Sequence, residues 1–120
     1  MAAGSPRQNR TVLVVDDDPI VRQALGRILE LEGFSVQTAG SIEEAGALLD
    51  GQHAVLLDLN LPDGLGTTLL RAVRSMHHGT RVAVLTGAGT DLVEQVRRMG
   101  PDRLMRKPID LPSLLAWLRE

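Results

Sequence analysis

The fold is decided by His53-Ala54-Val55-Leu56-Leu57-Asp58, which runs directly into Leu59-Asn60-Leu61-Pro62-Asp63-Gly64. A short apolar run that ends in turn residues is typical of a strand buried on both faces of a sheet. Asp58 then stands where this strand leaves the sheet. An unpaired carboxylate at the border of a core is costly. Its position therefore indicates that other parts of the chain supply partners for it.

The composition bounds what the chain can be. Its 120 residues correspond to one domain. Phe34 and Trp117 are the only aromatic residues, so the core must be aliphatic. A net charge of −2 and a pI near 5.9 give no electrostatic basis for binding nucleic acid or an anionic membrane. The absence of cysteine excludes disulfides, thiolate metal sites and a cysteine nucleophile.

The sequence shows no sign of a secretion signal or of a membrane span. Residues 1–10 are small and polar, which predicts a disordered lead-in before a domain over residues 11–120. They lack the apolar region of a signal peptide, and no apolar run approaches the roughly 20 residues of a membrane span. A cytoplasmic location is the simplest interpretation.

Hydrophobic periodicity predicts five strands that alternate with five helices. The strands are expected over residues 11–15, 34–38, 54–57, 81–85 and 103–105. The helices are expected from Pro19 to the stop at Gly33, over 42–50, over 67–76 with Met76 on the apolar side, around Leu92 to Met99, and over 111–118 with Trp117 partly exposed. Asp18 is placed to cap the first helix. The residues from Asn60 to Gly66 are expected to form a loop.

This alternation is typical of an α/β protein with a doubly wound, five-stranded parallel sheet. Parallel strands bring their carboxyl ends to one edge, where ligands of such sheets bind. Polar residues follow four of the predicted strands: Asp16, Asp17, Asp58, Thr86 and Lys107. We expect three carboxylates, a hydroxyl and an ammonium to meet at this edge.

Clustered carboxylates either raise a pKa or bind a cation. Oxygen ligands on a rigid edge suit Mg²⁺ or Mn²⁺. A metal together with Lys107 also suits a phosphate, and a carboxylate such as Asp58 is a known type of nucleophile toward phosphorus. Because phosphoryl transfer needs mainly positioning and charge neutralisation, the predicted edge has the parts for it.

Four segments carry a family resemblance: Val14-Val15-Asp16-Asp17-Asp18-Pro19, Leu56-Leu57-Asp58-Leu59-Asn60-Leu61-Pro62-Asp63-Gly64, Leu85-Thr86-Gly87 and Arg106-Lys107-Pro108. In order and spacing they resemble the receiver domain of bacterial two-component response regulators, over about residues 11–119. The resemblance implies a flavodoxin-like fold with strand order 2-1-3-4-5. It also implies a cis peptide bond between Lys107 and Pro108.

The resemblance implies a role for each site residue. Asp58 would accept a phosphoryl group from a sensor histidine kinase, and Asp16, Asp17, Asp58 and the backbone carbonyl of Asn60 would hold Mg²⁺. Thr86 would be the switch hydroxyl, and Lys107 would pair with the phosphoryl group. The domain would catalyse only its own phosphorylation and dephosphorylation.

The resemblance also implies a relay. The change would reach an output domain or partner through the face made by helix four, strand five and helix five, a face that also allows a phosphorylation-dependent dimer. Receivers usually carry Tyr or Phe three residues before the lysine, where this chain has Leu104, so switching by an aromatic side chain is in question.

Two other functions stay open at this point. One is a small phosphohydrolase that uses the same aspartyl chemistry on an external ester, although no second acid is placed as a general acid and no cap domain is present. The other is a degenerate receiver that binds its partner without phosphorylation. The complete set of motif residues counts against the degenerate receiver, while Leu104 leaves room for it.

Overall fold

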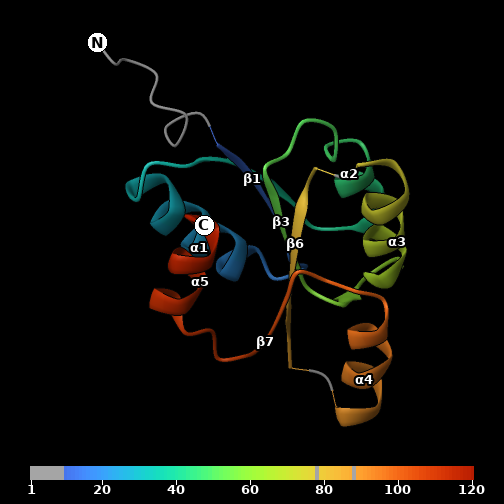
Figure 1. The fold of residues 1–120 in the computed structure, drawn as a ribbon. Helices are drawn as coiled ribbons and strands as arrows, with labels where there is room; N and C mark the ends of the chain where they lie inside the picture. Colours follow the sequence, from blue (N-terminus) through green and yellow to red (C-terminus); the bar gives the residue numbers. More distant parts are fainter. Residues whose placement is uncertain (1–9, 78, 88) are drawn as a thin grey trace.

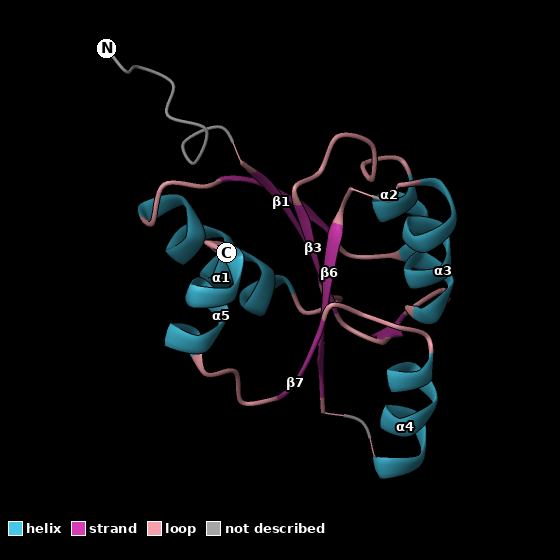
Figure 2. Cartoon of the chain, viewed as in Figure 1, coloured by secondary structure: helices cyan, strands magenta, loops and turns pink. Residues whose placement is uncertain are grey.

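The computed structural model describes residues 10–77, 79–87 and 89–120, so residues 1–9 of the predicted lead-in lie outside it. Figures 1 and 2 show the described elements. In chain order these are β1 (Thr11–Val15), α1 (Pro19–Leu31), β2 (Ser35–Ala39), α2 (Ile42–Gly46), β3 (Ala54–Leu57), β4 (Asn60–Leu61), β5 (Gly64–Leu65), α3 (Thr67–Met76), β6 (Arg81–Thr86), α4 (Thr90–Arg98), β7 (Arg103–Arg106) and α5 (Leu111–Leu118). None of the helices described is long and apolar enough to cross a bilayer.

The five long strands form one parallel sheet in the order β2-β1-β3-β6-β7. This is the predicted order 2-1-3-4-5, counted over the strands of the main sheet. The predicted loop after β3 instead contains a small antiparallel hairpin, in which β4 pairs with β5. Two-residue strands are too short to show an alternating pattern, so the sequence gives no sign of them.

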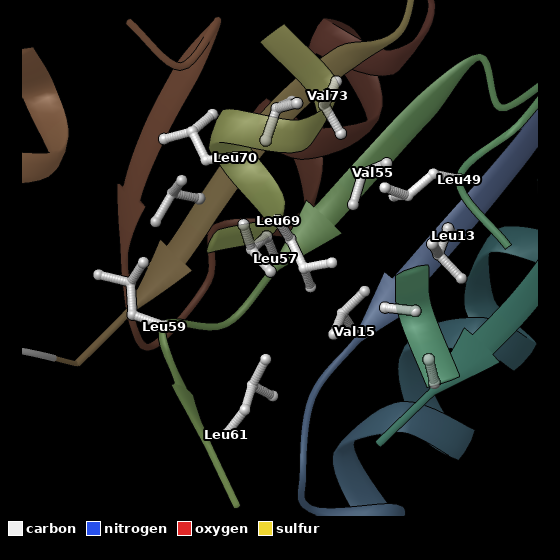
Figure 3. Close-up of a cluster of buried hydrophobic side chains, with 14 of the residues drawn as sticks. Leu13, Val15, Leu49, Val55, Leu57, Leu59, Leu61, Leu69, Leu70 and Val73 are labelled. Atoms are coloured by element: carbon white, nitrogen blue, oxygen red, sulfur yellow. The ribbon is translucent and has the colours of Figure 1, made fainter. Parts of the chain in front are cut away.

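Helices cover both faces of the sheet: α1 and α5 lie on one face, and α2, α3 and α4 lie on the other (Figure 1). Alternate residues of β1 serve the two layers, with Val12 and Val14 packed toward α1 and α5, and Leu13 and Val15 toward α2 and α3. Figure 3 shows the second of these clusters, around β3 and α3. The prediction of a central strand buried on both faces is confirmed, since all four residues of β3 are buried.

Three details of the predicted helices are wrong. Met76 is 67% exposed, because spacing identifies the apolar face of a helix but not how far the core extends along it. Trp117 is only 4% exposed, since it packs in the α1–α5 layer with the guanidinium of Arg81 4.2 Å from its ring centre. Helix α2 ends at Gly46, although Leu49 beyond it is still buried in the core as expected.

The amino edge of the sheet holds the end of α5. Arg10 Nη1 donates to the carbonyl oxygen of Leu118 at 2.9 Å, and Arg81 Nη1 donates to that of Trp117 at 2.8 Å. His53 Nε2 lies 3.3 Å from the same Leu118 oxygen, to which it acts as a donor. The last turn of a helix has unpaired carbonyls and the negative end of its dipole, so the charged donors Arg10 and Arg81 stabilise it, and His53 adds a hydrogen bond.

Candidate functional site

Asp58 is the first residue after β3 and lies at the carboxyl edge of the sheet. Its backbone amide donates to the carbonyl of Val15 at 2.9 Å, which continues the pairing of β3 with β1 by one residue. Its side chain is almost buried, with 7% of the residue exposed, and Oδ1 accepts a weak hydrogen bond from the amide of Asn60 at 3.4 Å. The carboxylate is therefore held inside the edge, away from bulk water.

The three acids after β1 divide between two tasks. Asp18 caps α1, because its Oδ1 accepts a hydrogen bond from the amide of Ile20 at 2.9 Å, as predicted. Asp16 turns inward and is 5% exposed, and its Oδ1 accepts from the amide of Asp18 at 2.9 Å. Asp17 is exposed beside it. Capping thus accounts for one acid and leaves two at the sheet edge.

Lys107 follows β7 and bridges the two buried acids. Its Nζ lies 3.0 Å from Oδ2 of Asp16 and 3.5 Å from Oδ2 of Asp58. The Lys107 amide donates to the carbonyl of Thr86 at 2.9 Å, which ties the end of β7 to the end of β6. The peptide bond between Lys107 and Pro108 is cis, as the family resemblance implied.

Burial and the charges at this edge together shift the pKa of two groups. Burial raises the pKa of Asp58, and the charges of Asp16 and Asp17 add to this, while Lys107 and the amide of Asn60 oppose it. Burial on its own lowers the pKa of Lys107, but its hydrogen bond with Asp16 and the charges of Asp58 and Asp16 outweigh burial and raise it. Lys107 therefore stays charged, and the ionised form of Asp58 is held at a cost.

The acids form a set of donors that fits a hard divalent cation. Asp16, Asp17 and Asp58 each offer a carboxylate oxygen, and these oxygens lie within 4.8 Å of one another. An all-oxygen set with few carboxylates and open access to water is the kind that Mg²⁺ uses, since this ion keeps several of its waters. The cluster can therefore hold a metal ion through Asp16, Asp17 and Asp58.

The other two predicted residues lie at the same edge. Thr86 ends β6, the neighbour of β3 in the sheet, and is fully buried. Asn60 opens the β4–β5 hairpin directly after Asp58, where its amide contacts the carboxylate and its backbone pairs with Leu65. The sheet thus carries all the predicted positions to one edge, where Lys107 is in direct contact with Asp16 and Asp58.

Three residues around the site were not predicted. Gly66 lies so close to the strand exit that a Cβ there would be 2.5 Å from the backbone oxygen of Asp58. Asp63 accepts hydrogen bonds from the amides of Ile42 and Glu43, and so joins the hairpin to the start of α2. Arg22 of α1 donates to the backbone carbonyl of Asp16 at 2.7 Å. All three contact backbone atoms, and such contacts leave no pattern of residue types in a sequence.

Comparison with known proteins gives a consistent result. Residues 12–119 match the family model of the response regulator receiver domain. The chain is 36% identical over 115 residues to the acid tolerance regulatory protein ActR of Rhizobium meliloti, which covers 92% of this chain and 58% of ActR. The curated relatives are longer, and the chain spans between 28% and 58% of their length.

Solved structures share the whole fold. A CheY-like response regulator receiver domain protein from Methanospirillum hungatei superposes with a TM-score of 0.85 at 28% identity, over 92% of this chain and 91% of that one. A response regulator from Burkholderia pseudomallei, with a phosphorylated aspartic acid, a calcium ion and citrate, gives 0.83 at 29% identity, over 92% and 66%.

Proposed function

The chain belongs to the response regulator receiver family of two-component signal transduction, and we propose that its Asp58 accepts a phosphoryl group from a sensor histidine kinase. Domains of this family act in phosphorylation-controlled signalling. The observation that carries the assignment to Asp58 is the contact set at the carboxyl edge, where Lys107 bridges Asp16 and Asp58 and Asp17 lies alongside. A relative from Burkholderia pseudomallei contains a phosphorylated aspartic acid and a calcium ion, which agrees with this chemistry.

The proposed transfer forms one bond and breaks another. A carboxylate oxygen of Asp58 attacks the phosphorus of the donor phosphohistidine, a P–O bond forms and the P–N bond breaks, and the released imidazole takes up a proton. The product is an acyl phosphate on Asp58. Hydrolysis by water returns the carboxylate and inorganic phosphate, so the domain would catalyse only its own phosphorylation and dephosphorylation.

Each neighbour of Asp58 has a proposed task. Asp16, Asp17, Asp58 and the backbone carbonyl of Asn60 would hold Mg²⁺, with Mn²⁺ as a substitute, and the ion would neutralise charge on the transferred group. Lys107, already charged and 3.5 Å from Asp58, would pair with the phosphoryl oxygens.

The response to phosphorylation is proposed to start at Thr86 and Lys107. The acyl phosphate carries roughly −1.5 to −2 charges in place of the single charge of the carboxylate, and its oxygens accept hydrogen bonds. Both residues would be drawn toward it. Because the Lys107 amide is bound to the Thr86 carbonyl, β6 and β7 would respond together. The output surface is then the α4–β7–α5 face, which has a groove of about 530 Å³ lined by residues of all three elements. An output domain, a partner protein or a second phosphorylated copy would bind there.

The relay differs from an aromatic switch. Leu104 stands opposite Val84 in the register of β6 and β7 and is partly buried against the core. An aliphatic side chain has no ring to swing between a buried and an exposed position, so we propose that Thr86 and the loop after β6 carry the change. Residues 11–120 would form the receiver domain, with residues 1–10 as a lead-in, in the cytoplasm.

The proposal is tested with Mg²⁺ and acetyl phosphate as the small phosphodonor. We expect a single phosphoryl adduct in the intact mass of the protein, and its loss in Asp58→Asn. Asp50→Asn is the matched control, because Asp50 is a fully exposed carboxylate that does not belong to the carboxyl edge.

Folded protein that acquires no adduct dependent on Asp58 would contradict the proposal and favour a receiver that works without phosphorylation. Repeated turnover of a generic phosphoester, abolished in Asp58→Asn, would instead identify a phosphohydrolase.

A further inference from the structure

Arg22 lies on the first turns of α1 and contacts the acidic cluster from a side that the proposed chemistry does not use. Its Nη1 donates to the backbone carbonyl of Asp16 at 2.7 Å, and its side chain is half-buried. We infer that Arg22 is a positioning residue for the metal site, which orients the Asp17 carboxylate by holding the peptide that joins Asp16 to Asp17. This inference rests on the proposed function, because it assigns a role in Mg²⁺ binding.

Asp17 is the acid that needs such support. The carboxylates of Asp16 and Asp58 each accept a backbone hydrogen bond and lie beside Lys107. Among the hydrogen bonds and ion pairs of the described residues, none involves the side chain of Asp17, which is exposed. Its direction therefore depends on the backbone that carries it, and Arg22 binds the carbonyl of the preceding residue.

The backbone amide of Asp16 is held as well. The amide of Asp16 donates to the carbonyl of Ala39 at the end of β2, at 3.1 Å. The residue is thus bound through its amide by β2 and through its carbonyl by α1. A ligand whose supporting groups are fixed loses less freedom when the ion binds, and removal of such groups typically weakens metal binding 10- to 100-fold.

Gly40 makes room for the guanidinium. A Cβ at this position would lie 2.6 Å from Nη1 of Arg22 and 3.2 Å from its Cζ. Gly40 has no positive φ, so alanine suits its backbone. The atoms in the way are the far end of a flexible side chain. Gly40→Ala should therefore displace the head of Arg22 with little effect on the fold, and without a change of charge.

Charge and positioning predict opposite results for Arg22→Ala. The guanidinium of Arg22 contacts the backbone of Asp16, and a cation there opposes the binding of a second cation nearby, so the loss of its charge alone would strengthen Mg²⁺ binding. The loss of its hydrogen bond would leave Asp17 poorly oriented and weaken binding. The direction of the change in Kd therefore separates the two roles.

The test is a titration with Mg²⁺ followed by NMR of backbone amides in the β1–α1 loop. We expect the Kd for Mg²⁺ to rise roughly tenfold in Arg22→Ala, and by a smaller factor in Gly40→Ala and Arg22→Lys. Arg27→Ala removes the same charge from an exposed position of the same helix and should bind as the wild type does.

An Arg22→Ala protein that is folded and binds Mg²⁺ as tightly as the wild type, or more tightly, would overturn the positioning role. Gly40→Ala decides the question in the same way if Arg22→Ala fails to fold. Wild-type protein that binds no Mg²⁺ would overturn both this inference and the proposed metal site, whereas phosphorylation of Asp58 is measured separately by mass.

Discussion

The two edges of the sheet carry opposite charge and differ in how that charge is paired. At the carboxyl edge, the carboxylates of Asp16, Asp17 and Asp58 converge, and Lys107 contacts two of them, Asp16 and Asp58. At the amino edge, donors from three strand starts bind the last carbonyls of α5. Both edges are formed by the same strands, so the difference in charge comes from the residues at the strand ends and not from the topology of the sheet.

This difference indicates that the residues of the amino edge stabilise the fold, whereas those of the carboxyl edge serve function. At the amino edge, cationic donors meet the negative end of a helix, and both sides gain. At the carboxyl edge, burial and like charges raise the pKa of Asp58 despite the contact with Lys107, so ionisation of Asp58 opposes folding. Perturbed groups of this kind are typical of functional sites.

The largest effect is expected from Gly66→Ala, which would show that the functional edge is also tightly packed. The new Cβ would lie 2.5 Å from the backbone oxygen of Asp58, so the strand exit would have to shift. We expect the free energy of unfolding, measured in urea, to fall by about 3 kcal/mol. Gly46→Ala is the control, since no atom lies within 4 Å of its new Cβ. Equal stability of the two variants would contradict the close approach.

A smaller loss of stability is expected from Arg81→Ala, which removes contacts at the amino edge. Arg81 gives a hydrogen bond to Trp117, a cation–π contact with its ring and an ion pair with Glu120. Together these should be worth about 2 kcal/mol in urea unfolding. Phosphorylation of the folded protein should be retained. Arg98→Ala removes the same charge from an exposed position of α4, and a similar loss there would show that Arg81 has no special role.

Asp58→Asn should act in the opposite direction and stabilise the protein. Because the pKa of Asp58 is raised, its ionisation costs stability at every pH above the ordinary value of 3.8, and asparagine removes that cost. We expect the Tm in metal-free buffer to rise by a few degrees. Added Mg²⁺ should raise the Tm of the wild type and leave that of the variant nearly unchanged. A variant with a lower metal-free Tm would show that the carboxylate is stabilising.

The smallest effect is expected from the titration of His53. Burial lowers the pKa of His53, the hydrogen bond to Leu118 opposes this, and the charges of Arg10 and Arg81 lower it further. The folded protein then binds fewer protons than the unfolded chain below the ordinary value of 6.5, so the stability from His53 is complete above that pH and declines below it.

The measurement is the fall in Tm between neutral pH and about pH 5.5. His53→Gln keeps a donor for the carbonyl but cannot titrate, so its Tm should fall less than that of the wild type. An equal fall in Tm in both proteins would show that His53 does not contribute to the pH dependence of stability.

The strands and the carboxyl edge could be predicted because their signals are local. An apolar run that ends in a carboxylate, as at Asp16 and Asp58, marks both a buried strand and the residue at its exit. The topology rules for parallel sheets then bring these exits together without any further information. The roles of these residues stay predictions, since they depend on a phosphoryl group and a metal ion: Asp16, Asp17, Asp58, Asn60, Thr86 and Lys107.

The amino edge and the support of the site could not be predicted in this way. Arg22, Arg81 and Arg10 donate to backbone carbonyls, and every residue has a carbonyl. The sequence therefore shows the donor but not its partner. The burial of Trp117 was missed because it comes from contacts distant in the sequence: the ring packs in the layer of α1 and α5, and Arg81, 36 residues away along the chain, lies over it.

Trp117 gives the protein a built-in optical probe. It is the only tryptophan, there is no tyrosine, and the ring is buried beneath Arg81 at the amino edge. The six residues of β6 separate that edge from Thr86, a distance of roughly 17 Å along the strand. The intrinsic fluorescence of Trp117 should therefore report the release of α5 during unfolding. It should not respond to metal binding or phosphorylation at the carboxyl edge, which need an added label or NMR to be detected.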